Sequence, residues 1–269
     1  MLQNKAILVT GAGGGIGRGI GEACAAKGAS VVVTDLNEAA AAESAAIIRS
    51  AYPGCKVVGM RMDVTDPAEV RDVVASAIAT FGRLDGLVNN AAVLVDKGLL
   101  LDSTPERRAL EIAVNVEGLI ICSQEFVRRA VDRGGGGAIV NIASVGGRRA
   151  HVLMANYSAS KAAVMNLTES QSAEWAQYSI NVNALCPGGV QTAMLHGAAE
   201  AKTMFSRSKK DAQAVRESWI APQLGRSVKS VEVGYVAAFL LSDEAILIRG
   251  QSISVTAGLE HEVLADYLD

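Results

Sequence analysis

A phenol and an ammonium group stand four residues apart in this chain, at Tyr157 and Lys161. If that segment is helical, the two side chains share one face, with their Cβ atoms about 5–6 Å apart. A free phenol has a pKa of about 10, but a neighbouring Lys⁺ stabilises the phenolate and lowers that pKa. Ser144 lies at the expected end of a strand, where its hydroxyl could orient the same substrate oxygen. The three residues predict proton exchange with a hydroxyl or carbonyl group; the alternative is a buried polar helix face.

The segment Thr10–Gly17 is rich in glycine and lies between an apolar run and a helical run. Residues without side chains let a backbone turn sharply and approach a pyrophosphate at a helix N-terminus, where free N–H groups and the helix dipole favour anions. A glycine-rich loop is a weak signal by itself, but this position favours a dinucleotide site over a plain tight turn. The expected contacts are Gly11, Gly14, Gly15, Ile16 and Gly17.

Asp35 ends the second apolar run, and Leu36 follows it. A carboxylate there can accept hydrogen bonds from both ribose hydroxyls of an adenosine and would repel a 2′-phosphate. Neither Leu36 nor Gly14 supplies a compensating positive charge. The sequence therefore favours NAD over NADP, with Asp35 and Leu36 in the cofactor site; the alternative is that Asp35 only caps the next helix.

Short β-branched or apolar runs alternate with helical segments along the whole chain. The expected strands are Lys5–Thr10, Ser30–Thr34, Lys56–Met60, Leu84–Asn89, Ala138–Ala143, Ile180–Cys186 and Ser252–Thr256. Several are apolar on both faces, as in strands buried within a parallel sheet. The pattern predicts an α/β fold over residues 1–269: a single-domain, Rossmann-type doubly wound parallel sheet of about seven strands, with helices on both faces.

Two of the helices have marked ends. Asp66 is a plausible N-cap for a helix with an apolar stripe that ends at Phe81, and a second helix is expected from Thr104 to Arg133. Residues 191–225 break the alternation, since they are polar and rich in Lys and Arg. Because they follow the sixth strand, the sheet-end rule predicts a substrate-covering insertion; a pair of solvated surface helices is the other interpretation.

Composition excludes several function classes. The chain is 50% hydrophobic and 20% charged, so it can bury a large core, and its net charge of −3 offers no basic footprint for nucleic acid. No apolar run is long enough to cross a bilayer, and the apolar strand pattern at residues 5–10 leads us to expect no secretory leader. Four cysteines without CxxC spacing fit reduced thiols and a cytoplasmic location. His196 and His261 lack metal-ligand spacing, so no metal is expected.

With these motifs in order, the chain resembles the short-chain dehydrogenase/reductase family over essentially its whole length. The matching elements are Thr10–Gly17, Asp63-Val64, Asn89-Asn90-Ala91-Ala92, Asn115, Ser144, Tyr157 with Lys161, and Pro187-Gly188. Two departures are mild: Ala92 stands where glycine is common, and Thr256-Ala257-Gly258 replaces the usual Asp-Gly-Gly.

The resemblance assigns roles to these residues. Asp63 and Val64 would contact the adenine; Asn90 and Ala91 would lie beside the cofactor. Asn115 would bend its helix and help hold a water that relays protons to Lys161, and Lys161 would hydrogen-bond the nicotinamide ribose. The nicotinamide would be lined by Pro187, Gly188, Val190 and Thr192.

The substrate pocket is expected to be lined by residues near the reacting groups. The candidates are Ser144, Gly146, His151, Met154, Tyr157 and Met194. His151 and the pair Arg148-Arg149 could bind an acidic or polyhydroxylated substrate, but a loop with solvated charges is an equal alternative.

The resulting prediction is an NAD-dependent oxidoreductase that interconverts a secondary alcohol, as in a polyol, sugar or diol, and its ketone. Reduction of 3-oxoacyl or steroid-type ketones stays open. Two alternatives come from other classes of protein. One is a non-catalytic NAD(H) sensor; the other is an SAM-dependent methyltransferase, which would leave Tyr157 and Lys161 unexplained. The resemblance also implies a homo-oligomer, with a tetramer favoured, joined through the helix around Tyr157–Tyr178 and through Arg249–Asp269.

Overall fold

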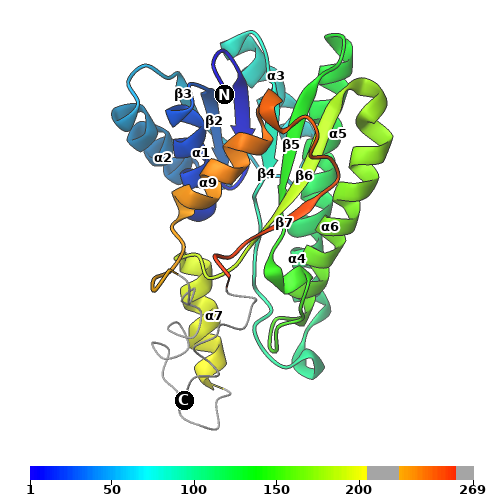
Figure 1. The fold of residues 1–269 in the computed structure, drawn as a ribbon. Coiled ribbons are helices and arrows are strands. Elements are labelled where there is room, and N and C mark those ends of the chain that lie inside the picture. Colours follow the sequence, from blue (N-terminus) through cyan, green and yellow to red (C-terminus); the bar gives the residue numbers. More distant parts are fainter. Residues whose placement is uncertain (205–223, 259–269) are drawn as a thin grey trace.

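Seven parallel strands form one sheet in a computed structural model that describes residues 1–204 and 224–258. Their order across the sheet is β3-β2-β1-β4-β5-β6-β7 (Figure 1). The strands are β1 (Ala6–Val9), β2 (Ser30–Asp35), β3 (Val57–Arg61), β4 (Gly86–Asn89), β5 (Gly137–Ile142), β6 (Ile180–Pro187) and β7 (Ser252–Val255). Each expected strand is confirmed, with ends that differ by at most two residues.

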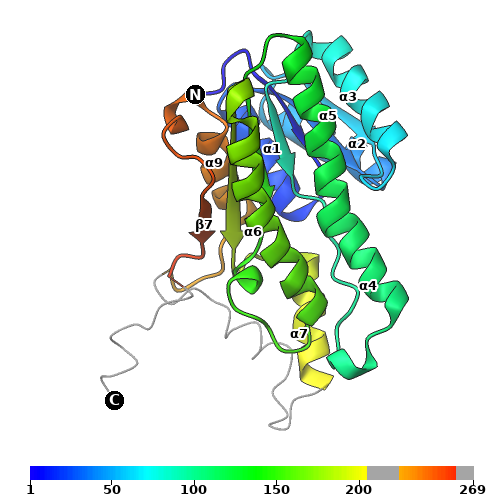
Figure 2. The same ribbon diagram turned by 90° about the vertical axis from the view of Figure 1, so that its right-hand side faces the viewer.

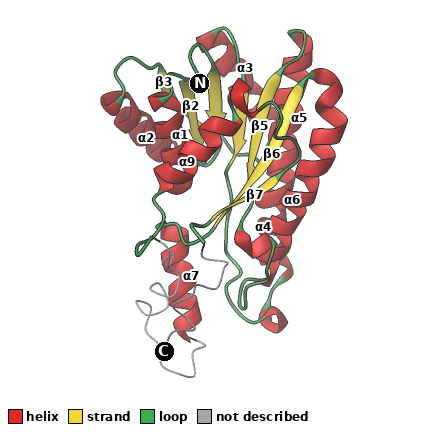
Figure 3. Ribbon diagram, viewed as in Figure 1, coloured by secondary structure: helices red, strands yellow, loops and turns green. Residues whose placement is uncertain are grey.

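Helices cover both faces of the sheet (Figures 2 and 3). One face carries α1 (Gly15–Ala26), α2 (Glu38–Ala51) and α9 (Ser230–Leu240). The opposite face carries α3 (Pro67–Phe81), α5 (Gly118–Asp132) and α6 (Ala155–Trp175). The predicted doubly wound α/β fold is thus confirmed.

The alternation of side chains explains why a central strand such as β1 is apolar throughout. In β1, Ile7 and Val9 belong to the core beneath α1 and α9, whereas Ala6 and Leu8 belong to the core on the opposite face. All four are at most 1% exposed. A strand covered on both sides has no solvent-exposed face, so its sequence does not alternate between apolar and polar residues.

The strand order reverses between β1 and β4, the neighbouring strands at the centre. In open parallel sheets, ligands bind outside the carboxyl ends of the strands at such a reversal. The loops that follow β1, β2, β4, β5 and β6 all reach this edge, and α7 (Ala193–Met204) lies beyond it (Figure 1).

The helix starts follow from local capping. Asp66 caps α3 by accepting from the N–H groups of Ala68 and Glu69, at 2.8 and 3.2 Å, as the sequence predicts. The long helix expected from Thr104 to Arg133 is instead α4 (Pro105–Ile112), a π-helical turn at Ala113–Glu117, and α5. Short 3₁₀ helices occur at Leu100–Asp102, Val145–Gly147, Ala176–Tyr178 and Asp243–Ala245.

The expected insertion at 191–225 begins with Gln191, Thr192 and then α7; residues 205–223 lie outside the described part of the chain, as do His261 and the rest of 259–269. Across the residues that are described, no helix is long and apolar enough to cross a membrane.

Candidate active site

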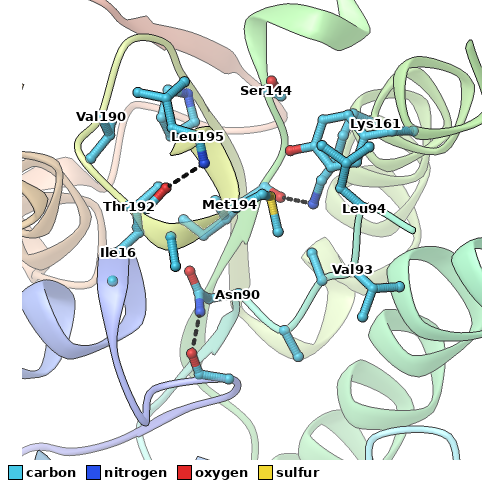
Figure 4. Close-up of a pocket in the computed structure, with 18 of the residues that line it drawn as sticks. Ile16, Asn90, Val93, Leu94, Ser144, Lys161, Val190, Thr192, Met194 and Leu195 are labelled. Atoms are coloured by element: carbon cyan, nitrogen blue, oxygen red, sulfur yellow. Dashed lines mark hydrogen bonds between the residues drawn. The ribbon is translucent and has the colours of Figure 1, made fainter. Parts of the chain in front are cut away.

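A cavity of about 560 Å³ follows the carboxyl edge of the sheet, from the end of β2 to α7 (Figure 4). Most residues predicted for the cofactor line it: Gly11, Gly14, Gly15, Ile16, Asp35, Leu36, Asp63, Val64, Asn90, Ala91, Pro187, Gly188, Val190 and Thr192. Ser144, His151, Met154, Tyr157, Lys161 and Met194 line the other end. The structure therefore gathers segments far apart in sequence into one continuous site.

The glycine loop is shaped by close backbone approach. Gly11 has φ +60°, and a Cβ there would lie 2.7 Å from Ala91 Cα. A Cβ at Gly17 would lie 2.6 Å from Asn90 Nδ2. Asn90 Nδ2 in turn donates to the carbonyl oxygens of Thr10 and Gly11, at 2.8 and 2.9 Å. The loop after β1 is thus bound to the end of β4, and any side chain at either glycine would separate the two.

The N-terminus of α1 faces this cavity without a side-chain cap. Gly14 is the N-cap residue, and no side chain in the described part of the chain accepts from the first N–H groups of the helix. Those groups are the ordinary partners of a pyrophosphate, and the helix dipole adds to the attraction. The loop and helix start therefore fit the phosphates of a dinucleotide.

Asp35 is fixed by two backbone donors. Its Oδ2 accepts from the N–H of Gly13 at 3.0 Å, and its Oδ1 from the N–H of Asn37 at 3.0 Å. A carboxylate can accept about four hydrogen bonds, so each oxygen keeps capacity for one ribose hydroxyl. Asp35 does not cap the next helix, because Asn37 caps α2 by accepting from Ala40 N at 3.2 Å.

Asp63 and Val64 line the cavity beside β3. Asp63 Oδ1 accepts from both the backbone N–H and the hydroxyl of Thr65, at 2.9 and 2.7 Å. Val64 is 7% exposed and packs against Gly118, where a Cβ would lie 2.6 Å from Val64 Cγ2. Both residues therefore present fixed surfaces at the end of the cavity that Asp35 also lines.

The reacting groups come from β5 and α6. Ser144 lies just after β5, whereas Tyr157 and Lys161 lie one turn apart on α6, as predicted. Lys161 is 3% exposed; its Nζ donates to the carbonyl of Ile142 at 2.7 Å and lies 5.7 Å from the centre of the Tyr157 ring. An ammonium group beside a phenol can stabilise a phenolate, so the arrangement can accept and release a proton at the Tyr157 oxygen.

Burial shifts both groups toward their neutral forms. Desolvation raises the pKa of the Tyr157 phenol to about 12, although the Ser144 hydroxyl opposes this shift. Desolvation also lowers the pKa of the Lys161 ammonium to about 8. Charge supplied by a bound cationic ring would favour the phenolate, because an opposite charge nearby stabilises the ionised form.

A buried amide network fixes the height of α6 above the sheet. Asn89 Nδ2 donates to Asn141 Oδ1 at 2.8 Å, between neighbouring strands. Asn141 Nδ2 then donates to Thr168 Oγ1 at 2.9 Å and to Gln171 Oε1 at 3.0 Å, both on α6. Since these bonds are directional and buried, they define where the helix that carries Tyr157 and Lys161 must lie.

The loop after β6 closes the middle of the cavity. Pro187 ends β6, and Val190 pairs with Val228 in an isolated bridge. Thr192 Oγ1 accepts from Leu195 N at 3.2 Å at the start of α7 (Figure 4). A Cβ at Gly15 would lie 3.5 Å from Thr192 Cγ2, so this loop and the glycine loop face one another.

Three predicted site residues do not line the cavity: Gly17, Gly146 and Asn115. Gly17 is packed against Asn90, and the N–H of Gly146 donates to Ser144 Oγ at 3.0 Å. Asn115 is 1% exposed within the π-helical turn, and its amide donates to Val93 O and Ser160 Oγ, at 3.0 and 3.1 Å. Both of its amide hydrogens are therefore engaged with the protein.

Sequence reasoning missed several lining residues: Val93, Leu94, Val145, Leu195 and Ala198. Their position in the sequence could have identified them, because they follow the carboxyl ends of β4, β5 and β6, where ligands bind.

It also missed Glu111, which is fully buried. Glu111 Oε1 accepts from the N–H groups of Val95 and Asp96, at 2.8 and 3.0 Å, and so holds the loop after β4. Its i, i+4 spacing to Asn115 could have revealed it.

Metal ligands do not gather in the described residues, where no group of three or more His, Cys, Asp or Glu side chains could hold an ion. His196 is exposed on α7. The four cysteines are free thiols. Taken with the geometry above, the site is that of a dinucleotide-binding α/β protein with a proton-transfer group at one end.

Comparison with known proteins agrees with this class. A sequence family described as enoyl-(acyl carrier protein) reductase matches residues 11–260. Sorbitol dehydrogenase of Cereibacter sphaeroides is 36% identical over 257 residues, which cover 96% of this chain and 98% of that protein. 2,5-Dichloro-2,5-cyclohexadiene-1,4-diol dehydrogenase of Sphingobium indicum is 34% identical over 259 residues, which cover 96% and 97%.

A solved structure of NAD⁺-bound xylitol dehydrogenase superposes with a TM-score of 0.89 at 29% identity, covering 96% of this chain and 99% of that one. The chain belongs to the short-chain dehydrogenase/reductase family, as its motifs predict. It is an oxidoreductase that interconverts secondary alcohols and ketones, and its family uses a nicotinamide cofactor.

Proposed function

We propose that the protein oxidises a secondary alcohol to its ketone, reversibly, with NAD as the hydride carrier and Tyr157 as the acid/base. The observation that carries this proposal is that Tyr157 and Lys161 line one end of the cavity, while the glycine loop and Asp35 line the other. When bound, the cofactor supplies a hydride acceptor. The remaining chemistry is proton transfer, which falls to the chain's own residues.

In the direction of oxidation, Tyr157 takes the hydroxyl proton as the carbon–hydrogen bond breaks. Ser144 holds the same oxygen, so that it stays in line with the Tyr157 oxygen as its charge changes. Lys161, fixed on Ile142 O at 2.7 Å, stabilises the phenolate. In the reverse direction Tyr157 returns the proton to the developing alkoxide.

NAD rather than NADP is the proposed cofactor. Asp35 places a fixed negative charge where the adenosine ribose would bind, and Leu36 beside it is 59% exposed and uncharged. The carboxylate can accept from two ribose hydroxyls but would repel a phosphate in the place of one of them.

The relatives named for sorbitol and for a cyclic diol support a polyol or diol as the substrate class. Homotetramer formation and a cytoplasmic location, both expected from the sequence, stay predictions.

The test follows cofactor reduction by its absorbance at 340 nm, with NAD and a panel of polyols and diols. Tyr157→Phe should lower kcat by about 10²–10⁴-fold and leave the Kd for NADH within about threefold. Tyr178→Phe, at a residue outside the cavity, is the matched control. Full turnover by Tyr157→Phe would refute the mechanism.

A non-catalytic NAD(H) sensor is the second candidate. The complete set of Ser144, Tyr157 and Lys161 argues against it, since a sensor has no use for a proton-transfer group. Tight NADH binding without oxidation of any alcohol in the panel would favour it.

A further inference from the structure

We propose that the substrate is a secondary alcohol on a compact apolar frame that carries one further oxygen beside the reacting carbon, with His151 recognising that oxygen. A carbocyclic vicinal diol is the simplest such compound. This inference rests on the proposed function, because it assigns the remainder of the same substrate.

Within the described residues, the wall beside the reacting groups is apolar. Leu94, Met154 and Ala198 form a buried cluster, at 8%, 7% and 4% exposure, against which Met194 and the Tyr157 ring also pack. Figure 4 shows Leu94, Met194 and Leu195 around the space beside Lys161. These side chains come from the loop after β4, from the start of α6 and from α7. Together they can bury hydrocarbon but cannot pair with hydroxyl groups.

Among the described residues at this end of the cavity, His151 is the one polar side chain besides Ser144, Tyr157 and Lys161. A methyl group placed on Gly146 would lie 3.1 Å from His151 Cδ2 and 3.4 Å from Ser144 Oγ. Those two distances put His151 Cδ2 and Ser144 Oγ no more than about 6.5 Å apart, and both side chains line the cavity. With the reacting oxygen on Ser144, a second oxygen on the next carbon would come within reach of His151, and an imidazole can donate to or accept from it.

The cost of removing water from hydroxyl groups should then make kcat/KM higher for a cyclic diol than for an acyclic polyol. A hexitol bound for oxidation at one carbon carries further hydroxyls along its chain, and these would meet Leu94, Met154 and Met194. Each hydroxyl buried without a partner lowers kcat/KM by about tenfold. Two such hydroxyls are enough for a preference of about 100-fold, and the ring carbons of a cyclic diol would gain from the same apolar contacts.

The experiment compares cis-1,2-cyclohexanediol, cyclohexanol and sorbitol as substrates of the full-length protein with NAD. We expect kcat/KM for the cyclic diol to exceed that for sorbitol by at least about 100-fold. His151→Leu should lower the ratio of kcat/KM for the diol to that for cyclohexanol by at least about tenfold. His196→Leu makes the same change on the exposed side of α7 and should leave that ratio unchanged.

Two results would overturn the inference: sorbitol oxidised as well as the cyclic diol, or a diol-to-cyclohexanol ratio that His151→Leu leaves intact. Either can occur while Tyr157→Phe still abolishes turnover, in which case the proposed function stands and the substrate assignment fails. Absence of turnover with all three alcohols and with the polyol panel would instead refute the proposed function, and this inference with it.

Discussion

Replacing Asp35 by Asn tests how the chain selects its cofactor. The change keeps the size of the side chain and removes its charge. It leaves one acceptor oxygen, so only one of the N–H groups of Gly13 and Asn37, each 3.0 Å from the carboxylate, keeps its partner. Hydrogen bonds to a charged acceptor contribute about 1.5–3 kcal/mol and neutral ones about 0.5–1.5 kcal/mol. Two ribose hydroxyls would therefore lose about 2 kcal/mol in total, or about 30-fold in NAD affinity.

The same substitution should improve NADP binding. Two unit charges 4 Å apart repel by about 1 kcal/mol in water and about 4 kcal/mol at a partly buried site. Asp35 is half-buried, so relief of about 2 kcal/mol is reasonable. The ratio of kcat/KM for NAD to that for NADP should then fall by about 1000-fold in Asp35→Asn.

The assay measures kcat/KM for both cofactors with one alcohol, supported by fluorescence titration of NADH and NADPH. Asp66→Asn is the matched control, because Asp66 caps α3 on the surface and Asn caps equally well. A wild-type preference for NADP, or a ratio in Asp35→Asn within about threefold of wild type, would refute the electrostatic argument.

Three further changes have outcomes that follow from contacts. Lys161→Met should be more stable than wild type at pH 7 and should lose about 2.5 kcal/mol of that advantage by pH 10. The reason is that burial lowers the pKa of Lys161 to about 8 in the folded protein, from its usual value of 10.5. Urea unfolding at both pH values measures this, and an unchanged difference would contradict it. Glu111→Leu should lower the free energy of unfolding by about 2–3 kcal/mol, because two backbone N–H groups lose their acceptor. Glu111→Gln keeps an acceptor oxygen and should stay within about 1 kcal/mol of wild type. Equal effects of the two variants in urea unfolding would exclude a role for Glu111 in holding the loop after β4. Gly17→Ala should weaken NADH binding by at least about tenfold in fluorescence titration, because its Cβ would lie 2.6 Å from Asn90 Nδ2; wild-type affinity would show that the loop can relax.

The fold was predictable largely because the five inner strands are buried on both faces. Strands such as Ser30–Asp35 stand out as β-branched runs between helical segments, and their errors are confined to one or two terminal residues. The π-helical turn at Ala113–Glu117 was different. Nothing in local helix propensity marks it, so only the family resemblance indicated a bend at Asn115. Its cause is tertiary, because the Asn115 amide bonds to Val93 and Ser160.

The two ends of the cavity differ in how far sequence could specify them. The cofactor end is made largely of backbone, and close approach admits only glycine, as the 2.7 Å clash at Gly11 shows. The residue type therefore reveals the geometry. The substrate end is made of ordinary apolar side chains such as Leu94 and Ala198, whose types would suit any core. They line the same part of the cavity only because three separate segments pack together there.

This difference has a consequence for how the activity can vary. Lys161 is held by Ile142 O, and α6 is held by the amide network around Asn141, so neither depends on the wall that meets the substrate. The loop after β4 and α7 supply that wall, and Leu94 and Ala198 meet there without polar bonds between them. Volume-conserving changes on such a surface cost little stability. Substitutions at Leu94 or Ala198 should therefore change which alcohol is oxidised while the hydride and proton chemistry at Tyr157 stays the same.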